Sequence, residues 1–168
     1  VKDGVSEPDE TLTVTLSNPT GGATLGTPTT ATLTIRTSQL LLALEEAGLD
    51  PNQVAALDSI WMLRDPFPVI STVDMLFPPG SDKNTRVVVF VMNLQLAPGD
   101  TASTVRVNLV ASNGQTFDLG AEDVRPAPIT DFTQVTFRLP DNLAPGICNI
   151  KIKVHDQESN QGNIRIQN

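Results

Sequence analysis

Residues 148–154 read Cys-Asn-Ile-Lys-Ile-Lys-Val, an alternation of apolar and polar side chains that decides the fold class. A period of two residues is typical of a β-strand with one face in a core and the other in solvent. Similar stretches recur through residues 66–168, separated by Gly, Pro, Asn and Asp. We therefore expect seven strands there, at 67–72, 86–93, 103–111, 115–119, 132–139, 147–155 and 162–167.

Seven short strands in about 100 residues predict an immunoglobulin-like β-sandwich, so the fold class is all-β. Asn113-Gly114 between two alternating runs predicts a two-residue hairpin turn. The side chains expected to face the core are Val105, Val107, Leu109, Val135, Phe137, Leu139, Cys148, Ile150, Ile152, Val154, Ile164 and Ile166.

Residues 37–65 have a different pattern, which predicts a helical linker. Ser38 is a suitable N-cap before a Leu-rich run, and Gly48 is a suitable residue to end that helix. Asp50-Pro51 then predicts a second short helix extending to about Asp58. We expect the linker to pack its Leu face on a neighbouring sheet, with a subunit contact as the alternative.

Residues 1–36 predict a β-hairpin with one apolar and one hydroxyl face. Leu12, Val14 and Leu16 alternate with threonines, and the alternation resumes after the Asn18–Gly22 turn signal. An isolated hairpin is marginally stable in water, so this segment needs a partner sheet.

The charge and composition exclude several classes of protein. The 11 basic and 19 acidic residues give a net charge of −8, which argues against a nucleic-acid or anionic-membrane partner. The chain has no apolar run of about 18 residues that could insert into a membrane. Its single Cys excludes an internal disulfide and every site made of several Cys ligands.

No residue pattern supports catalysis, and we expect no enzyme. His155 is the only imidazole, and it follows the strand that carries Cys148. The alternation points Cys148 into the core, where a thiol behaves as a small hydrophobic group. Carboxylate pairs such as Glu122-Asp123 lie on predicted loops without sign of a pocket.

Residues 7–35 resemble the end of a Calx-β domain. The stretch Glu7-Pro-Asp-Glu-Thr-Leu-Thr-Val-Thr-Leu-Ser-Asn-Pro-Thr-Gly-Gly-Ala-Thr-Leu-Gly and the Ala31–Ile35 strand match the family's closing pattern. The resemblance covers only the last two strands of a domain of about 100 residues. It implies that the chain carries the tail of such a sandwich without its body.

The same resemblance raises the possibility of calcium as the only cofactor. Calcium takes about six to eight oxygen ligands, and the acidic residues near the start of the chain could supply some of them. In family members an acidic run after the last strand contributes, but here Arg36-Thr37-Ser38 replaces it. A solvated acidic turn is therefore the simpler interpretation. The candidate ligands are Asp3, Glu7, Asp9 and Glu10.

Residues 66–168 look like a bacterial Ig-like domain of the IPT/TIG kind. The run from Leu139 to Val154, then Ser159-Asn160 and a closing Ile164-Arg-Ile strand, are similar to the family's short pattern. Both families are common in large bacterial surface proteins. The resemblance therefore implies an extracellular or cell-surface location.

Two strands without a sheet predict a structural subunit of an extracellular filament or surface assembly. The hairpin would complete a sandwich with another copy by strand addition. One alternative is the C-terminal adhesive or ligand-binding module of a large secreted protein, and another is a hairpin folded back within one chain. The start at Val1 predicts either a processed product or part of a longer protein. The expected subunit-interface residues are Leu12, Val14, Leu16, Ala31, Leu33 and Ile35.

Overall fold

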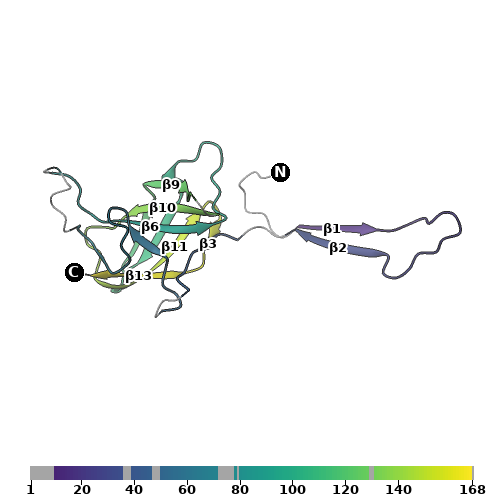
Figure 1. Ribbon diagram of the computed structural model, residues 1–168, viewed down its shortest axis with the longest axis horizontal. Helices are drawn as coiled ribbons and strands as arrows, with labels where there is room; N and C mark the ends of the chain where they lie inside the picture. Colours follow the sequence, from purple (N-terminus) through teal and green to yellow (C-terminus); the bar gives the residue numbers. More distant parts are fainter. Residues whose placement is uncertain are drawn as a thin grey trace. The chain divides into compact units, whose positions relative to one another are not determined.

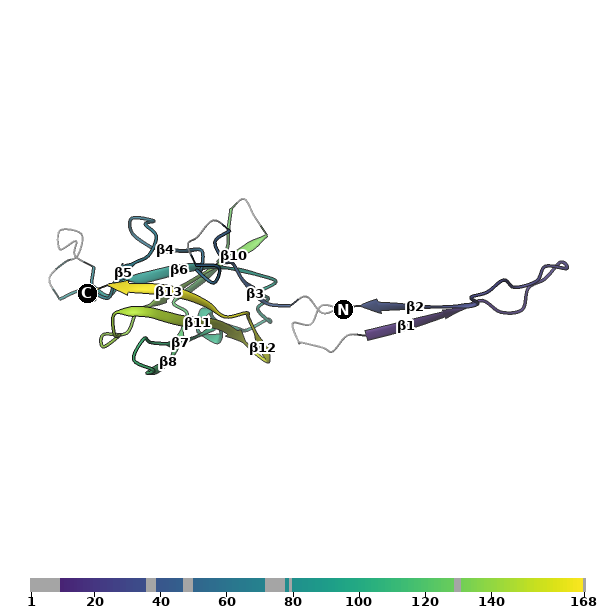
Figure 2. The same cartoon turned by 90° about the horizontal axis from the view of Figure 1, so that it is seen from below.

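The structure, a computed structural model, describes residues 10–35, 39–46, 50–71, 78, 80–128 and 131–167. These residues are all-β, and the chain divides into two compact units. The smaller unit lies within Val5–Ser38, and the larger one includes Gln39–Asn168. Figures 1 and 2 show the elements of each unit from two directions. No helix in the described part of the chain is long and apolar enough to cross a membrane.

The larger unit contains two sheets, whose strands are labelled in Figures 1 and 2. In the first sheet β6 pairs on one side with β10, which pairs with β9, and on the other side with both β3 and β4. Its strands are β3 (Leu41–Leu42), β4 (Ala56–Asp58), β6 (Arg86–Met92), β9 (Asp123–Pro126) and β10 (Phe132–Arg138).

The second sheet has the order β5-β13-β11-β7-β8, and β12 also pairs with β11. A short 3₁₀ turn, Ala102–Thr104, precedes β7. The strands are β5 (Phe67–Pro68), β7 (Arg106–Val110), β8 (Thr116–Gly120), β11 (Gly146–Val154), β12 (Gln157–Glu158) and β13 (Gly162–Gln167).

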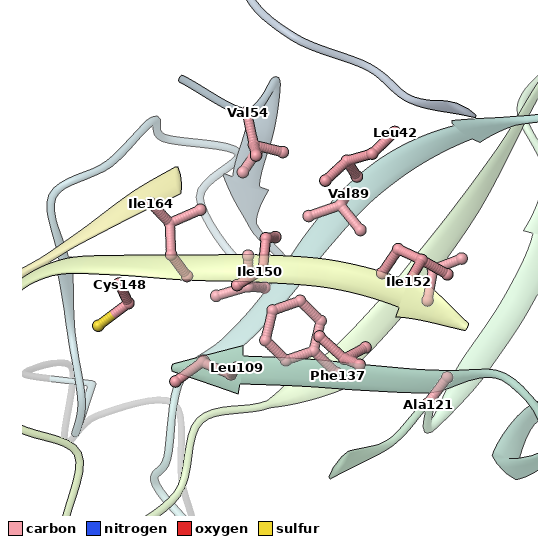
Figure 3. Packing of buried hydrophobic residues seen from close by; sticks show 14 of the residues in the cluster. Leu42, Val54, Val89, Leu109, Ala121, Phe137, Cys148, Ile150, Ile152 and Ile164 are labelled. Atoms are coloured by element: carbon pink, nitrogen blue, oxygen red, sulfur yellow. The ribbon is translucent and has the colours of Figure 1, made fainter. Parts of the chain in front are cut away.

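One hydrophobic core joins the two sheets into a β-sandwich. Phe137 and Val89 of the first sheet point toward Ile150 and Leu109 of the second (Figure 3). All twelve side chains that the alternation placed inside are buried, so that prediction is confirmed. The strand at 162–167 also matches its prediction, whereas β3, β4, β9 and β12 were not predicted.

The helical linker predicted for residues 37–65 is not confirmed, because its described residues form strands and turns. Leu41 and Leu42 of β3 pair with β6, and β4 continues along the same side of β6. Between them the chain leaves the sheet, and Gln53 bridges to Asn163 on β13. Pairing with the side of β6 that faces away from β10 therefore overrides the helical preference of the Leu run. This segment belongs to the sandwich.

The turn predicted at Asn113-Gly114 is one residue longer than expected. The Ala111 and Gln115 backbones close a three-residue loop, with the Ala111 N–H donating to the Gln115 carbonyl at 2.8 Å. Gly114 has a φ of 85°, a left-handed conformation that a three-residue hairpin loop of this type requires. Gly114 therefore occupies the last position of the loop, where its left-handed conformation is needed.

Candidate functional site

The smaller unit is a two-stranded antiparallel ribbon, which we call the hairpin. Strand β1 (Glu10–Thr15) pairs with β2 (Thr30–Ile35) in continuous register, and the Leu16 N–H donates to the Thr29 carbonyl beyond β1. Leu12 lies opposite Leu33 and Val14 opposite Ala31. Directly opposite residues share one face of a sheet, so these side chains form a single apolar face.

The other face of the hairpin consists of threonine pairs. The register places Thr11 opposite Thr34, and the next two threonine rungs follow the same pattern. Residues 11–35 contain no charged side chain, and the two strands contain no proline. In the described part of the chain, β1 and β2 pair only with each other. Apart from Glu10 at the start of β1, each strand therefore has an outer edge without the charges, prolines or bulges that usually block edge-to-edge pairing.

The apolar face of the hairpin is exposed. Leu12, Val14, Leu16 and Leu33 have relative exposures of 53–62%. Ala31 is exposed as well, and the Ile35 side chain lies outside the described residues. The structure thus brings five of the six predicted interface residues to one surface or its immediate continuation, while the prediction that they contact another chain stays untested.

The candidate calcium ligands lie outside the described residues. This applies to Asp3, Glu7 and Asp9, and to the side chain of Glu10, whose backbone begins β1. Within the described ranges, no group of three or more His, Cys, Asp or Glu side chains is arranged to hold a metal ion. Calcium at the start of the hairpin therefore stays a prediction.

His155 and Cys148 have separate structural environments. His155 Nε2 lies 2.9 Å from Asp100 Oδ2, and the residue has a φ of 51° in the turn after β11. Cys148 is buried at the other end of that strand, about 23 Å away along an extended backbone. Burial raises the pKa of the Cys148 thiol. The thiol is therefore poorly suited to act as a nucleophile, and it lies far from the only imidazole.

One cluster of charged side chains in the described part of the sandwich is internally paired. Asp82 Oδ2 accepts from Arg138 Nε at 2.6 Å and from Arg86 Nη2 at 2.9 Å. Arg86 also contacts Glu122, and Arg138 contacts Asp141. The hydrogen bond from Arg138 Nε is the largest cause that lowers the pKa of Asp82. A second hydrogen bond, from Arg138 Nη2, is the largest cause that lowers the pKa of Asp141. These groups fasten the 82–86 segment to the end of β10.

A second exposed apolar surface lies on residues 58–63, which we call the Asp58 loop. Asp58 Oδ1 accepts from the Ile60 and Trp61 amides at 3.0 and 2.6 Å, and Oδ2 accepts from the Leu63 amide at 2.8 Å. The Asp58 amide donates back to the Leu63 carbonyl at 2.9 Å. This bonding holds Ile60, Trp61, Met62 and Leu63 outward, with exposures of 40–63%.

A pocket of about 350 Å³ opens beside the Asp58 loop. Its lining combines apolar residues of the loop and of β5 with polar residues: Ile60, Trp61, Leu63, Phe67 and Pro68, and Ser59, Arg64, Ser71, Thr85, Arg86 and Gln167. The pocket thus lies near the ends of β4 and β5, which are edge strands of the two sheets. Its volume is at the lower end of the range typical of ligand pockets.

Sequence reasoning missed this surface because it assigned the segment to a helical linker. The signal was nevertheless present: Asp58-Ser59 is followed by four consecutive apolar residues. Such a run cannot place all its side chains on one face of a strand, and the preceding Asp is suited to bind the amides of a turn. An exposed apolar turn was therefore a possible interpretation.

Comparisons with known protein families, with characterised proteins and with solved structures find no match for this chain. The fold and its exposed surfaces are therefore the basis for the functional argument.

Proposed function

We propose that this chain is a structural subunit that assembles with copies of itself by strand addition through the hairpin. The observation that carries the proposal is the combination of an exposed apolar face with two unprotected strand edges. An isolated two-stranded ribbon is marginally stable in water. Pairing with a further strand would satisfy backbone groups on an edge and cover apolar side chains together.

The size of the hairpin favours strand addition over simple stacking of two apolar faces. Six residues per strand give a face about 20 Å long and about 10 Å wide, or about 200 Å². A stable protein interface buries about 800 Å² on each partner. The apolar face alone supplies about a quarter of this area. Backbone hydrogen bonds to a neighbouring sheet and contacts from flanking residues would supply more.

The charge distribution permits a partner that is another copy of the same chain. The chain carries a net charge of −8, so contacts between most parts of two copies are opposed by repulsion. Residues 11–35 carry no charge and avoid this direct opposition. We place the assembly outside the cell, as a filament or surface layer, because the sequence resembles modules of bacterial surface proteins.

The pocket beside Trp61 favours a second candidate function, a ligand-binding module of a larger surface protein. In that case the chain would remain monomeric, and a small ligand bound in the pocket would shield its lining residues from solvent. Concentration-dependent assembly separates the two functions.

The test compares two double variants of the full chain that carry the same two added charges. L12D/L33D places them on one rung of the apolar face, whereas T13D/T32D places them on the next rung of the threonine face. We expect the wild type and T13D/T32D to form large species in sedimentation velocity and electron microscopy. L12D/L33D should remain monomeric at about tenfold higher concentration, which corresponds to at least 1.4 kcal/mol of lost association energy. Assembly of L12D/L33D, or a monomeric wild type at high concentration, would refute the proposal.

A further inference from the structure

The Asp58 loop is a second apolar surface in the described part of the chain that is built to remain exposed. Its side chains extend from a turn whose backbone is bound by the Asp58 carboxylate. The loop therefore does not need packing of Trp61 or Leu63 against its own sandwich to keep its shape. Large apolar side chains exposed together next to a pocket are typical of an interaction site.

The chemistry of this surface fits the hairpin of another copy. Residues 59–63 carry no charge, and neither do residues 11–35 of the hairpin. The pocket is lined mainly by apolar surface from Ile60, Trp61, Leu63 and Phe67. The exposed leucines and valine of the hairpin match the apolar part of this lining, which they would remove from water together with their own surface.

The charges beside the pocket are already partnered within the sandwich. Arg64 lines the pocket with a largely exposed side chain and makes a 3.4 Å ion pair with Glu45. Arg86 is already bonded to Glu122 and Asp82, and the Asp58 carboxylate is occupied by backbone amides. The uncharged stretch of the hairpin is flanked in the sequence by Asp9 and Glu10 on one side and by Arg36 on the other. Covering the pocket with the uncharged residues of the hairpin would therefore bury no charge that lacks a partner.

We infer that the Asp58 loop and its pocket are the receptor for the hairpin of a second copy. This inference rests on the proposed function and deepens it by naming the acceptor surface. Each chain then carries one donor and one acceptor, which are different surfaces. A contact between two different surfaces is heterologous, and unless the rotation closes a ring it continues into a filament.

The test uses two full-length variants that each lack one surface. L12D/L33D disables the donor, and I60S/L63S disables the acceptor while keeping Asp58 and Trp61. Met62→Asn is the matched control, because Met62 is exposed in the same loop without lining the pocket. Its φ of 56° suits asparagine. We expect neither surface variant to assemble alone, whereas M62N assembles as the wild type does.

Mixing the two surface variants gives the most specific result. The intact hairpin of I60S/L63S should bind the intact loop of L12D/L33D, and growth should stop at two chains in sedimentation velocity. If I60S/L63S assembles alone like the wild type, the acceptor lies elsewhere and this inference fails while the proposed function stands. If L12D/L33D assembles alone, the proposed function fails.

Trp61 provides an independent readout because it is the only tryptophan in the chain. In the mixture its emission should shift to shorter wavelength as the pocket is covered, and the shift should be absent when L12D/L33D is mixed with a chain carrying both sets of substitutions. A Trp61 already shielded in the monomer would overturn the inference, because the site would be filled within one chain. Shielding of Trp61 by a small ligand, without any association of chains, would also overturn the inference.

Discussion

At the scale of single residues, Asp58 gives the exposed loop its shape. Its two carboxylate oxygens accept from three backbone amides, a bonding pattern similar to that of a helix N-cap residue. The geometry explains how four consecutive apolar residues remain ordered without being buried.

Replacing Asp58 with Ala should lower the free energy of unfolding by about 1 kcal/mol, the usual cost of losing a cap of this kind. Asp58→Asn is the matched control, since its amide oxygen can still accept from Ile60 and Trp61. Urea unfolding measures the effect. Equal stability of the Ala variant and the wild type would show that the carboxylate does not hold the loop.

Asp82 couples the stability of the sandwich to pH. Its folded-state pKa lies below the unfolded value of about 3.9, because it accepts bonds from Arg138, Asn84 and Arg86. A carboxylate with a lowered pKa contributes stability above the unfolded pKa, and the contribution is lost as the pH falls below it. At pH 7, D82N should therefore be less stable than the wild type by about 1 kcal/mol, a modest value because the side chain is partly exposed.

The difference between D82N and the wild type should shrink as the pH falls from 5 to 2, as measured by thermal unfolding. Asp156→Asn, at an exposed carboxylate in the turn after β11, serves as the control for a general change of charge. A D82N penalty that is constant across this range would contradict the assignment.

At the scale of elements, the segment between β3 and β4 connects the two sheets. The Val54 amide donates to the Asn163 carbonyl, and the Asn163 amide donates to the Asn52 carbonyl. A Cβ at Gly162 would overlap Val54 Cγ2 and lie 2.9 Å from Leu44 Cδ2. Only glycine leaves room for this segment to cross β13 so closely.

Gly162→Ala should therefore destabilise the sandwich by about 1–3 kcal/mol and increase hydrogen exchange at residues 43–46 and 50–55. Gly120→Ala is the comparison, because the nearest atom to its added methyl group is the movable end of Arg106 at 3.1 Å. An equal loss of stability in both variants would show that the crossing is not specifically tight.

Alternation was sufficient to predict the core of the sandwich but not its edges. Leu109 and Ile150 lie on strands where about one side chain in two is buried, so the sequence pattern reports burial directly. Leu41 and Leu42 lie in a run of apolar residues that also has good helix propensity. Their extended form comes from pairing with β6, and this is a tertiary effect that the local sequence does not contain.

The two exposed apolar surfaces also differ in whether the sequence alone could predict them. The apolar face of the hairpin followed from the alternation of Leu12 and Val14 with threonines, and the register confirms that face. The Asp58 loop could not be located in the same manner, because its exposure depends on hydrogen bonds from one carboxylate to three amides. A pocket formed by segments distant in sequence, such as Trp61 and Gln167, also requires the fold.

At the scale of the whole molecule, the proposed assembly depends on strand addition by the hairpin. The sandwich has a continuous core, whereas the hairpin has an apolar face and two strand edges without partners in the described structure. One chain with a stable body and an unsatisfied ribbon is suited to link copies.

Hydrogen exchange of the backbone amides of residues 11–35, measured at several concentrations of the full chain, tests this claim most directly. Strand addition predicts that protection of these amides increases with concentration and includes amides that point away from the β1–β2 ladder. The amides of β11, in the core, should exchange at the same rate throughout and serve as the internal control. Hairpin amides that exchange rapidly at every concentration, or that are fully protected in the monomer, would contradict assembly through the hairpin.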